Sequence, residues 1–108
     1  MDDRSIFGKV FGNSPEVRIV DFFLDNKAFD FSKKDIIEAT GMSKATFYQH
    51  WDRLEQFGIV KISRRFGKAK LYELDHKSPL VNQLFEVEKQ LIRLAARKYQ
   101  PFRKTVSA

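Results

Sequence analysis

Cationic side chains gather in one short stretch, residues 61–70, and phosphate binding is the chemistry that suits them. Half of these positions are lysine or arginine, and no acid follows until Glu73. Each such group neutralises an anionic oxygen and donates hydrogen bonds to it. The stretch therefore favours a polyanionic partner, and a basic loop that only faces solvent is the plainer alternative. The cations are Lys61, Arg64, Arg65, Lys68 and Lys70.

Groups suited to covalent or metal chemistry are scarce in the chain. It has no cysteine, and its two histidines, His50 and His76, fall in different predicted elements. No glycine-rich phosphate loop and no spaced carboxylate motif accompanies them. We therefore expect no catalytic residue, no metal site and no cofactor, and we predict that the chain is not an enzyme.

Charge is divided unevenly along the chain. Residues 1–60 carry eight Lys and Arg against ten Asp and Glu, a net charge of −2, whereas residues 61–108 carry twelve against four, a net charge of +8. Asymmetry of this kind favours a nucleic-acid partner over an evenly solvated surface.

The bulk composition predicts one small globular domain over residues 1–108, with its core at about 14–75. The chain has 108 residues, of which 43% are apolar. No run of about 18 apolar residues is present, so we expect no membrane contact. The start, Met1-Asp2-Asp3-Arg4, lacks the basic and apolar regions of a signal peptide, which favours a cytoplasmic protein.

The first predicted helix follows Ser14-Pro15, where a capping serine precedes a proline suited to the first helical position. Apolar residues then recur at helical spacing as far as Asn26. Phe29-Asp30-Phe31 alternates as a very short strand would.

Two further helices are expected close together. Ser32 and Asp35 match a capping box, and Gly41 suits a left-handed end to that short helix. Ser43 caps the next helix, predicted over residues 44–57. Its apolar residues form one narrow stripe at i, i+4 and i+7, which leaves a broad polar face. That stripe is Phe47, Trp51 and Leu54.

A hairpin and a long helix complete the predicted order. Residues 59–63 and 69–74 alternate as two half-exposed strands, and residues 64–68 form the tip around Gly67. Ser78-Pro79 opens a helix predicted to reach about residue 99.

This order of elements resembles the winged helix-turn-helix domains, which include the ArsR-like and MarR-like transcriptional regulators and many small archaeal ones. The matching stretch is Ser32 to Leu74, especially residues 43–47 and 53–60. The resemblance implies a mainly α fold with a small β-hairpin, the wing, and a long C-terminal helix at about 78–99, which its own apolar stripe makes the predicted dimerisation helix.

The resemblance also implies that the third helix enters the DNA major groove with its N-terminal residues at base edges. Residue chemistry agrees, because Lys44 suits phosphate or guanine, Gln49 suits adenine, and Ala45 or Thr46 suits a thymine methyl. In projection Arg53 lies toward the Thr46 side of the helix, from which it can reach the phosphate backbone. The candidate recognition residues are Ser43, Lys44, Ala45, Thr46, Tyr48, Gln49 and Arg53.

Two residues of this helix have competing interpretations. Tyr48 is either an aromatic contact at the DNA surface or a partly buried tyrosine. His50 projects beside the apolar stripe, which favours a hydrogen-bonded structural histidine over a ligand.

In the wing, the predicted phosphate or minor-groove contacts are Arg64, Arg65, Lys68 and Lys70.

The last helix has an apolar stripe too wide for one small domain, so part of it is expected to meet a second subunit. One row of apolar residues along this helix is spaced at intervals of 4, 3, 4 and 3 positions. Glu88 interrupts a second apolar row beside it. The alternative is one broad stripe folded over the apolar residues of segment 6–11. The predicted dimer interface is Leu80, Leu84, Val87, Leu91 and Leu94.

Together these patterns predict a dimeric, sequence-specific double-stranded DNA-binding protein, a transcriptional regulator. A DNA-partition or architectural protein, and a protein-interaction module, are alternatives on the same fold. Metal sensing of the ArsR kind is poorly supported without cysteine ligands, and the identity of any small-molecule effector stays unknown.

Overall fold

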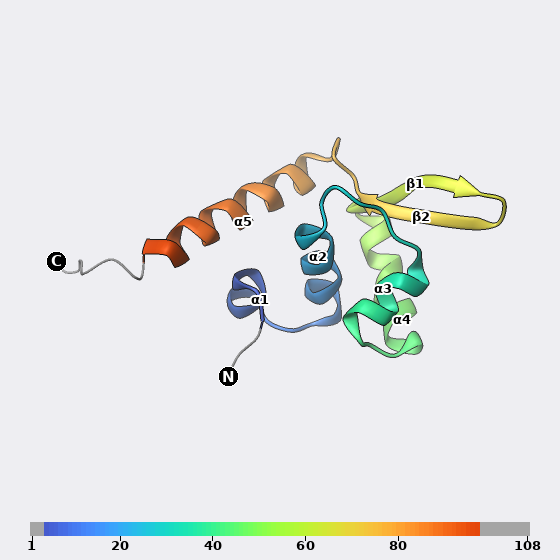
Figure 1. Ribbon diagram of the computed structural model, residues 1–108, viewed down its shortest axis with the longest axis horizontal. Coiled ribbons are helices and arrows are strands. Elements are labelled where there is room, and N and C mark those ends of the chain that lie inside the picture. Colours follow the sequence, from blue (N-terminus) through green and yellow to red (C-terminus); the bar gives the residue numbers. More distant parts are fainter. Residues whose placement is uncertain (1–3, 98–108) are drawn as a thin grey trace.

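A computed structural model describes residues 4–97, which form five helices and one hairpin (Figure 1). The hairpin and the last helix project in opposite directions from a compact group of helices. The predicted order of elements from residue 15 onward is confirmed. The elements are α1 (Ile6–Phe11), α2 (Pro15–Asp25), α3 (Lys33–Thr40), α4 (Lys44–Gln56), β1 (Val60–Phe66), β2 (Ala69–Leu74) and α5 (Pro79–Arg97).

Serine side chains start the helices at the predicted positions. The Ser14 and Ser43 hydroxyls accept from the backbone N–H groups of Val17 and Thr46, at 3.2 and 3.1 Å. Ser32 and Asp35 satisfy each other's backbone donors, so the capping box is present. α3 ends at Gly41 in the left-handed conformation (φ 70°), which turns the chain directly into α4.

An aromatic cluster joins α4 to the hairpin. Phe47 and Trp51 are completely buried and stack with ring centroids 5.0 Å apart. The Trp51 ring also meets Tyr72 of β2 edge-on, at 5.0 Å. The predicted stripe of α4 is therefore the side that faces the core, and its polar face is left outward.

The two strands pair antiparallel from Val60 opposite Leu74 to Phe66 opposite Ala69. The prediction that β1 ends at residue 63 is wrong, because a register shift at Ser63 lets pairing continue to Phe66. The tip is thus only Gly67 and Lys68, with Gly67 at a positive φ of 58°. The short strand expected at 29–31 is a single bridge between Phe31 and Tyr72.

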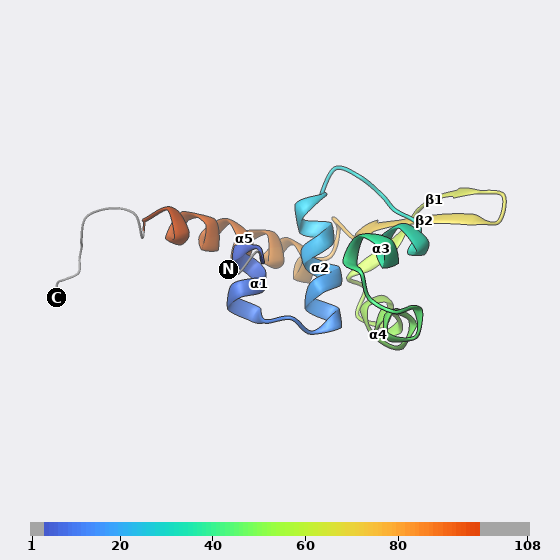
Figure 2. The same ribbon diagram turned by 60° about the horizontal axis from the view of Figure 1, so that its bottom comes forward.

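The long helix α5 packs one side on its own domain. Val81 is completely buried, and the Glu88 carboxylate is buried against Lys27, with its Oε1 atom 2.7 Å from Nζ. A helix at α1 was not predicted; it carries the buried Phe7 and lies beside α5 in both views (Figures 1 and 2). Residues 98 and 99 of the predicted last helix lie outside the described residues.

None of the helices in the described part of the chain is both long and apolar enough to span a membrane.

Candidate nucleic-acid interface

The N-terminal half of α4 presents an exposed polar face. Lys44, Ala45, Tyr48 and Gln49 are all exposed, as the helical projection predicted for a face turned away from Phe47. Thr46 is half-buried, and its hydroxyl oxygen accepts from the Ser43 hydroxyl at 2.9 Å. Thr46 is therefore engaged in the helix cap, whereas the other four side chains are exposed, although one edge of the Tyr48 ring packs against Phe47.

A carboxylate on α2 braces the middle of α4. Glu16 Oε2 lies 2.5 Å from His50 Nδ1 and accepts from Arg53 Nη1 at 3.0 Å. Burial works against ionisation of Glu16, but the hydrogen bond to His50, a backbone hydrogen bond and nearby positive charge together outweigh it, so the pKa of Glu16 lies below its ordinary value. His50 is hydrogen-bonded within the domain, as its structural interpretation predicts. Arg53 is oriented by Glu16 and still has a largely exposed side chain.

A second carboxylate braces the wing. Asp30, in the loop before α3, accepts from Arg64 Nε and Nη2, both at 2.8 Å, and from the Ser63 hydroxyl at 2.5 Å. The hydrogen bonds from Arg64 and then Ser63 hold the pKa of Asp30 well below its usual range. Sequence reasoning missed this pair, because Asp30 and Arg64 are 34 residues apart and no local pattern links them.

The other wing cations have no such partner. Arg65, Lys68 and Lys70 are exposed, and among the described residues no carboxylate lies within 4.0 Å of them. Lys61 differs, because it lies 3.8 Å from Glu73 Oε2. Of the five cations of the hairpin, two therefore have an acidic partner and three have none within the described structure.

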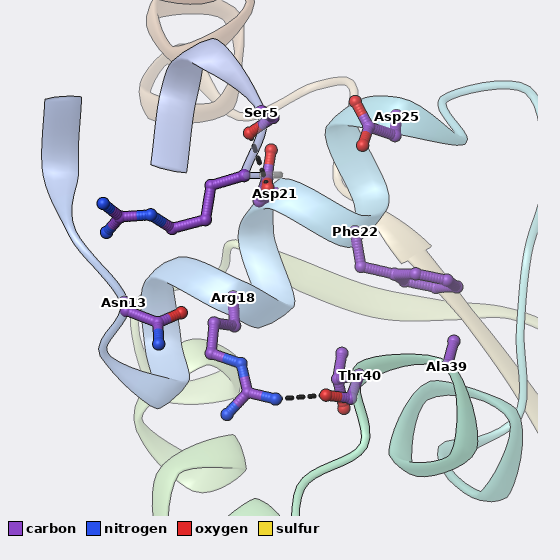
Figure 3. A pocket seen from close by; sticks show the side chains of 9 residues that line it. Ser5, Asn13, Arg18, Asp21, Phe22, Asp25, Ala39 and Thr40 are labelled. Carbon is purple, nitrogen blue, oxygen red and sulfur yellow. Dashed lines mark hydrogen bonds between the residues drawn. The ribbon is translucent and has the colours of Figure 1, made fainter. Parts of the chain in front are cut away.

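A polar depression of about 430 Å³ lies between α1, α2 and α3 (Figure 3). Ser5 donates to Asp21 Oδ2 at 2.7 Å, and the Arg18 guanidinium donates to the Thr40 carbonyl. Burial, followed by the charges of Asp21 and Glu88, raises the pKa of Asp25 at its rim. These contacts fix α1 on α2, and α2 on the turn that leads into α4.

An apolar groove of about 500 Å³ lies on another side, between α1, α2, the end of α4 and α5. Large apolar side chains remain exposed along it, among them Phe57 at 67% and Leu80 at 47%. Of the predicted dimer track, Leu80, Val87 and Leu94 are exposed, whereas Leu84 and Leu91 are half-buried against their own core. The groove is lined by Phe7, Phe11, Glu16, Val17, Val20, Arg53, Leu54, Phe57, Ile59, Leu80, Leu84 and Val87.

Comparison with known proteins identifies the fold. No protein-family model and no curated protein matches the chain. The homodimeric winged helix-turn-helix DNA-binding domain of Mb0332 from Mycobacterium bovis, a possible ArsR-family transcriptional regulator, is 20% identical, with a TM-score of 0.59 over 95% of this chain and 100% of that one. Rv0081 of M. tuberculosis is 20% identical, with a TM-score of 0.57 over 85% of this chain and 87% of that one. The chain therefore has the winged helix-turn-helix fold, as predicted.

The Asp30–Arg64 pair yields a pH-dependent prediction. The pKa of Asp30 is lowered in the folded state, so its contribution to the free energy of unfolding is present above the unfolded pKa of about 3.9 and fades as the pH falls below it. Asp30→Asn should therefore be less stable than the wild type at neutral pH, and the difference should shrink below about pH 4. Urea unfolding at several pH values measures this.

Asp52→Asn serves as the control, since Asp52 is exposed on α4 and has no ion-pair partner within the described residues. Amide exchange in β1 should accelerate in Asp30→Asn alone. A stability difference that stays constant from neutral pH down through pH 3 would contradict the role of the ionised pair.

Proposed function

We propose that the chain is a homodimeric transcriptional regulator that binds double-stranded DNA in a sequence-specific manner. The observation that carries the proposal is the exposed polar face of α4 beside a wing whose cations Arg65, Lys68 and Lys70 have no acidic partner among the described residues. The N-terminal half of α4 enters the major groove, where Gln49 and Lys44 reach base edges. The fold is also that of Mb0332, described as a homodimeric DNA-binding domain.

In this proposal the wing contacts the DNA backbone or the minor groove. Arg64 belongs to the contact although Asp30 holds two of its nitrogens, because its Nη1 group has no hydrogen-bond partner in the described structure. The bidentate pair fixes the guanidinium plane, so little side-chain entropy is lost when Nη1 meets a phosphate. Arg53 is oriented by a single hydrogen bond from its Nη1 group to Glu16.

The dimer forms over the apolar groove and the exposed track of α5. Phe57, Leu80 and Val87 line that groove with exposed side chains, and a second copy would remove them from water. A two-fold dimer presents two α4 helices to half-sites about one helical turn apart, so the operator is palindromic or nearly so.

Selection of bound fragments from a random duplex pool tests the function. A regulator should enrich one operator and bind it roughly 10³-fold or more tightly than random duplex. Equal binding to all duplexes would instead indicate a partition or architectural protein. Absence of binding even at low salt would overturn DNA binding and leave the protein-interaction module.

Substitution of Gln49 should change which base is preferred. Gln49→Ala removes a side chain that can pair with adenine, so discrimination at one base pair of each half-site should fall by about 1–3 kcal/mol. Titration of operators that vary at single base pairs measures this. Gln56→Ala, at the far end of the same helix, is the matched control and should leave the preference intact. The assignment of Gln49 fails if both variants keep the wild-type preference.

A charge placed in the groove should separate the subunits. Val87→Asp buries an unpaired carboxylate in the proposed interface, which should weaken association by at least about 3 kcal/mol, roughly 100-fold. Sedimentation velocity over a range of concentrations measures the dissociation constant. Gln90→Asp, on an exposed position of α5 that does not line the groove, is the control. A folded Val87→Asp that remains dimeric would remove this interface.

A further inference from the structure

A depression of about 260 Å³ lies between the start of α3 and the hairpin, and lysines form most of its lining. Lys68 contributes from the hairpin tip, and Lys70 and Tyr72 contribute from β2, where alternate residues share one face of the strand. Lys33, the first residue of α3, closes the opposite side. The start of α3 lies beside the hairpin in both views of the ribbon (Figures 1 and 2).

The ammonium group of Lys33 is held in place by aromatic rings. Its Nζ atom lies 5.4 Å from the ring centre of Tyr48, 5.5 Å from Tyr72 and 5.8 Å from Trp51. Rings attract a cation to their faces without neutralising its charge. Lys33 is therefore positioned at the junction of α3, α4 and β2, next to a candidate recognition residue, Tyr48.

Positive charge in this depression is not balanced by acids. Within the described part of the chain, no carboxylate lies within 4.0 Å of Lys33, Lys68 or Lys70. Arg65 also stands directly opposite Lys70 across the hairpin, and like charges in such cross-strand pairs are unfavourable. Lys33, Lys68 and Lys70 thus line one small space without an acidic partner among the described residues, an arrangement that a bound anion would stabilise.

We propose that this depression binds one phosphodiester of duplex DNA and that Lys33 is a phosphate contact beside the wing. The inference rests on the proposed function and adds a residue outside both α4 and the wing. The phosphodiester belongs to the duplex read by α4, because the Tyr48 ring that flanks Lys33 is exposed on that helix. A single backbone phosphate then bridges the helix-turn-helix and the wing, which fixes the hairpin relative to α4 when DNA is bound.

Lys33→Met tests the contact, because methionine keeps an unbranched apolar stem that can lie against the three rings and removes only the charge. Lys34→Met is the matched control: Lys34 is the adjacent exposed residue and does not line the depression. Binding of each variant to one short duplex is measured over a range of salt concentrations. Loss of one phosphate contact should reduce the slope of log K against log salt by about 0.9.

The expected result is a reduced slope for Lys33→Met, the wild-type slope for Lys34→Met, and an unchanged thermal midpoint of the free protein in both. Equal slopes for the two variants would overturn the site while leaving DNA binding intact. If the wild type itself fails to bind duplex at low salt, the proposed function fails, and the phosphate site fails with it.

A second measurement uses the unmodified sequence and does not depend on the folding of a variant. Lysine acetylation rates, followed by mass spectrometry, are compared with and without saturating duplex. Bound DNA should slow the acetylation of Lys33, Lys68 and Lys70 but not of Lys34. A rate at Lys33 that duplex does not change would overturn the proposal, because a phosphate in contact with the ammonium must shield it.

Discussion

Trp51 is completely buried where α4 meets β2, and the relative position of these two elements depends on its ring. The ring stacks on Phe47 within α4 and meets Tyr72 of β2 edge-on, with centroids 5.0 Å apart in each pair. Loss of so large a buried side chain costs about 3–5 kcal/mol, a sizeable part of the stability of a small domain. The same packing that stabilises the core therefore sets the angle between the candidate recognition helix and the wing.

Around this aromatic cluster, carboxylate partners determine which cationic side chains have a fixed orientation. Glu16 orients His50 and Arg53, and Asp30 orients Arg64 through two parallel hydrogen bonds. A guanidinium fixed in advance loses less entropy when it meets an anion. The unpaired cations of the wing carry charge without that orientation, and the repulsion between Arg65 and Lys70 across the hairpin disfavours the state without bound DNA. The two groups suit different tasks, since oriented groups set geometry and unpaired charge supplies salt-dependent affinity.

Much of the fold could be predicted because its determinants are local. The Ser32–Asp35 capping box, the left-handed Gly41 and the stripe of α4 all act within a few residues of one another. α1 was missed since a six-residue helix has little stability of its own and is held by tertiary contacts, such as the burial of Phe7 and the bond from Ser5 to Asp21. The exposed face of α4 followed from the same projection that placed its stripe.

The amino-acid sequence by itself determined the helices from α2 onward, the hairpin and the supply of cations, because capping, apolar periodicity and charge are local properties of the chain. Only the tertiary structure determined which of the described cationic side chains have an acidic partner. The register shift at Ser63 reverses the strand alternation, so that Arg65 lies opposite Lys70 while Arg64 lies opposite Leu71 and reaches Asp30. Likewise, Lys33 meets the wing only because α3 begins beside β2. The contacts of Asp30 with Arg64 and of Lys33 with the wing join residues more than thirty positions apart, and packing rather than local pattern brings them together.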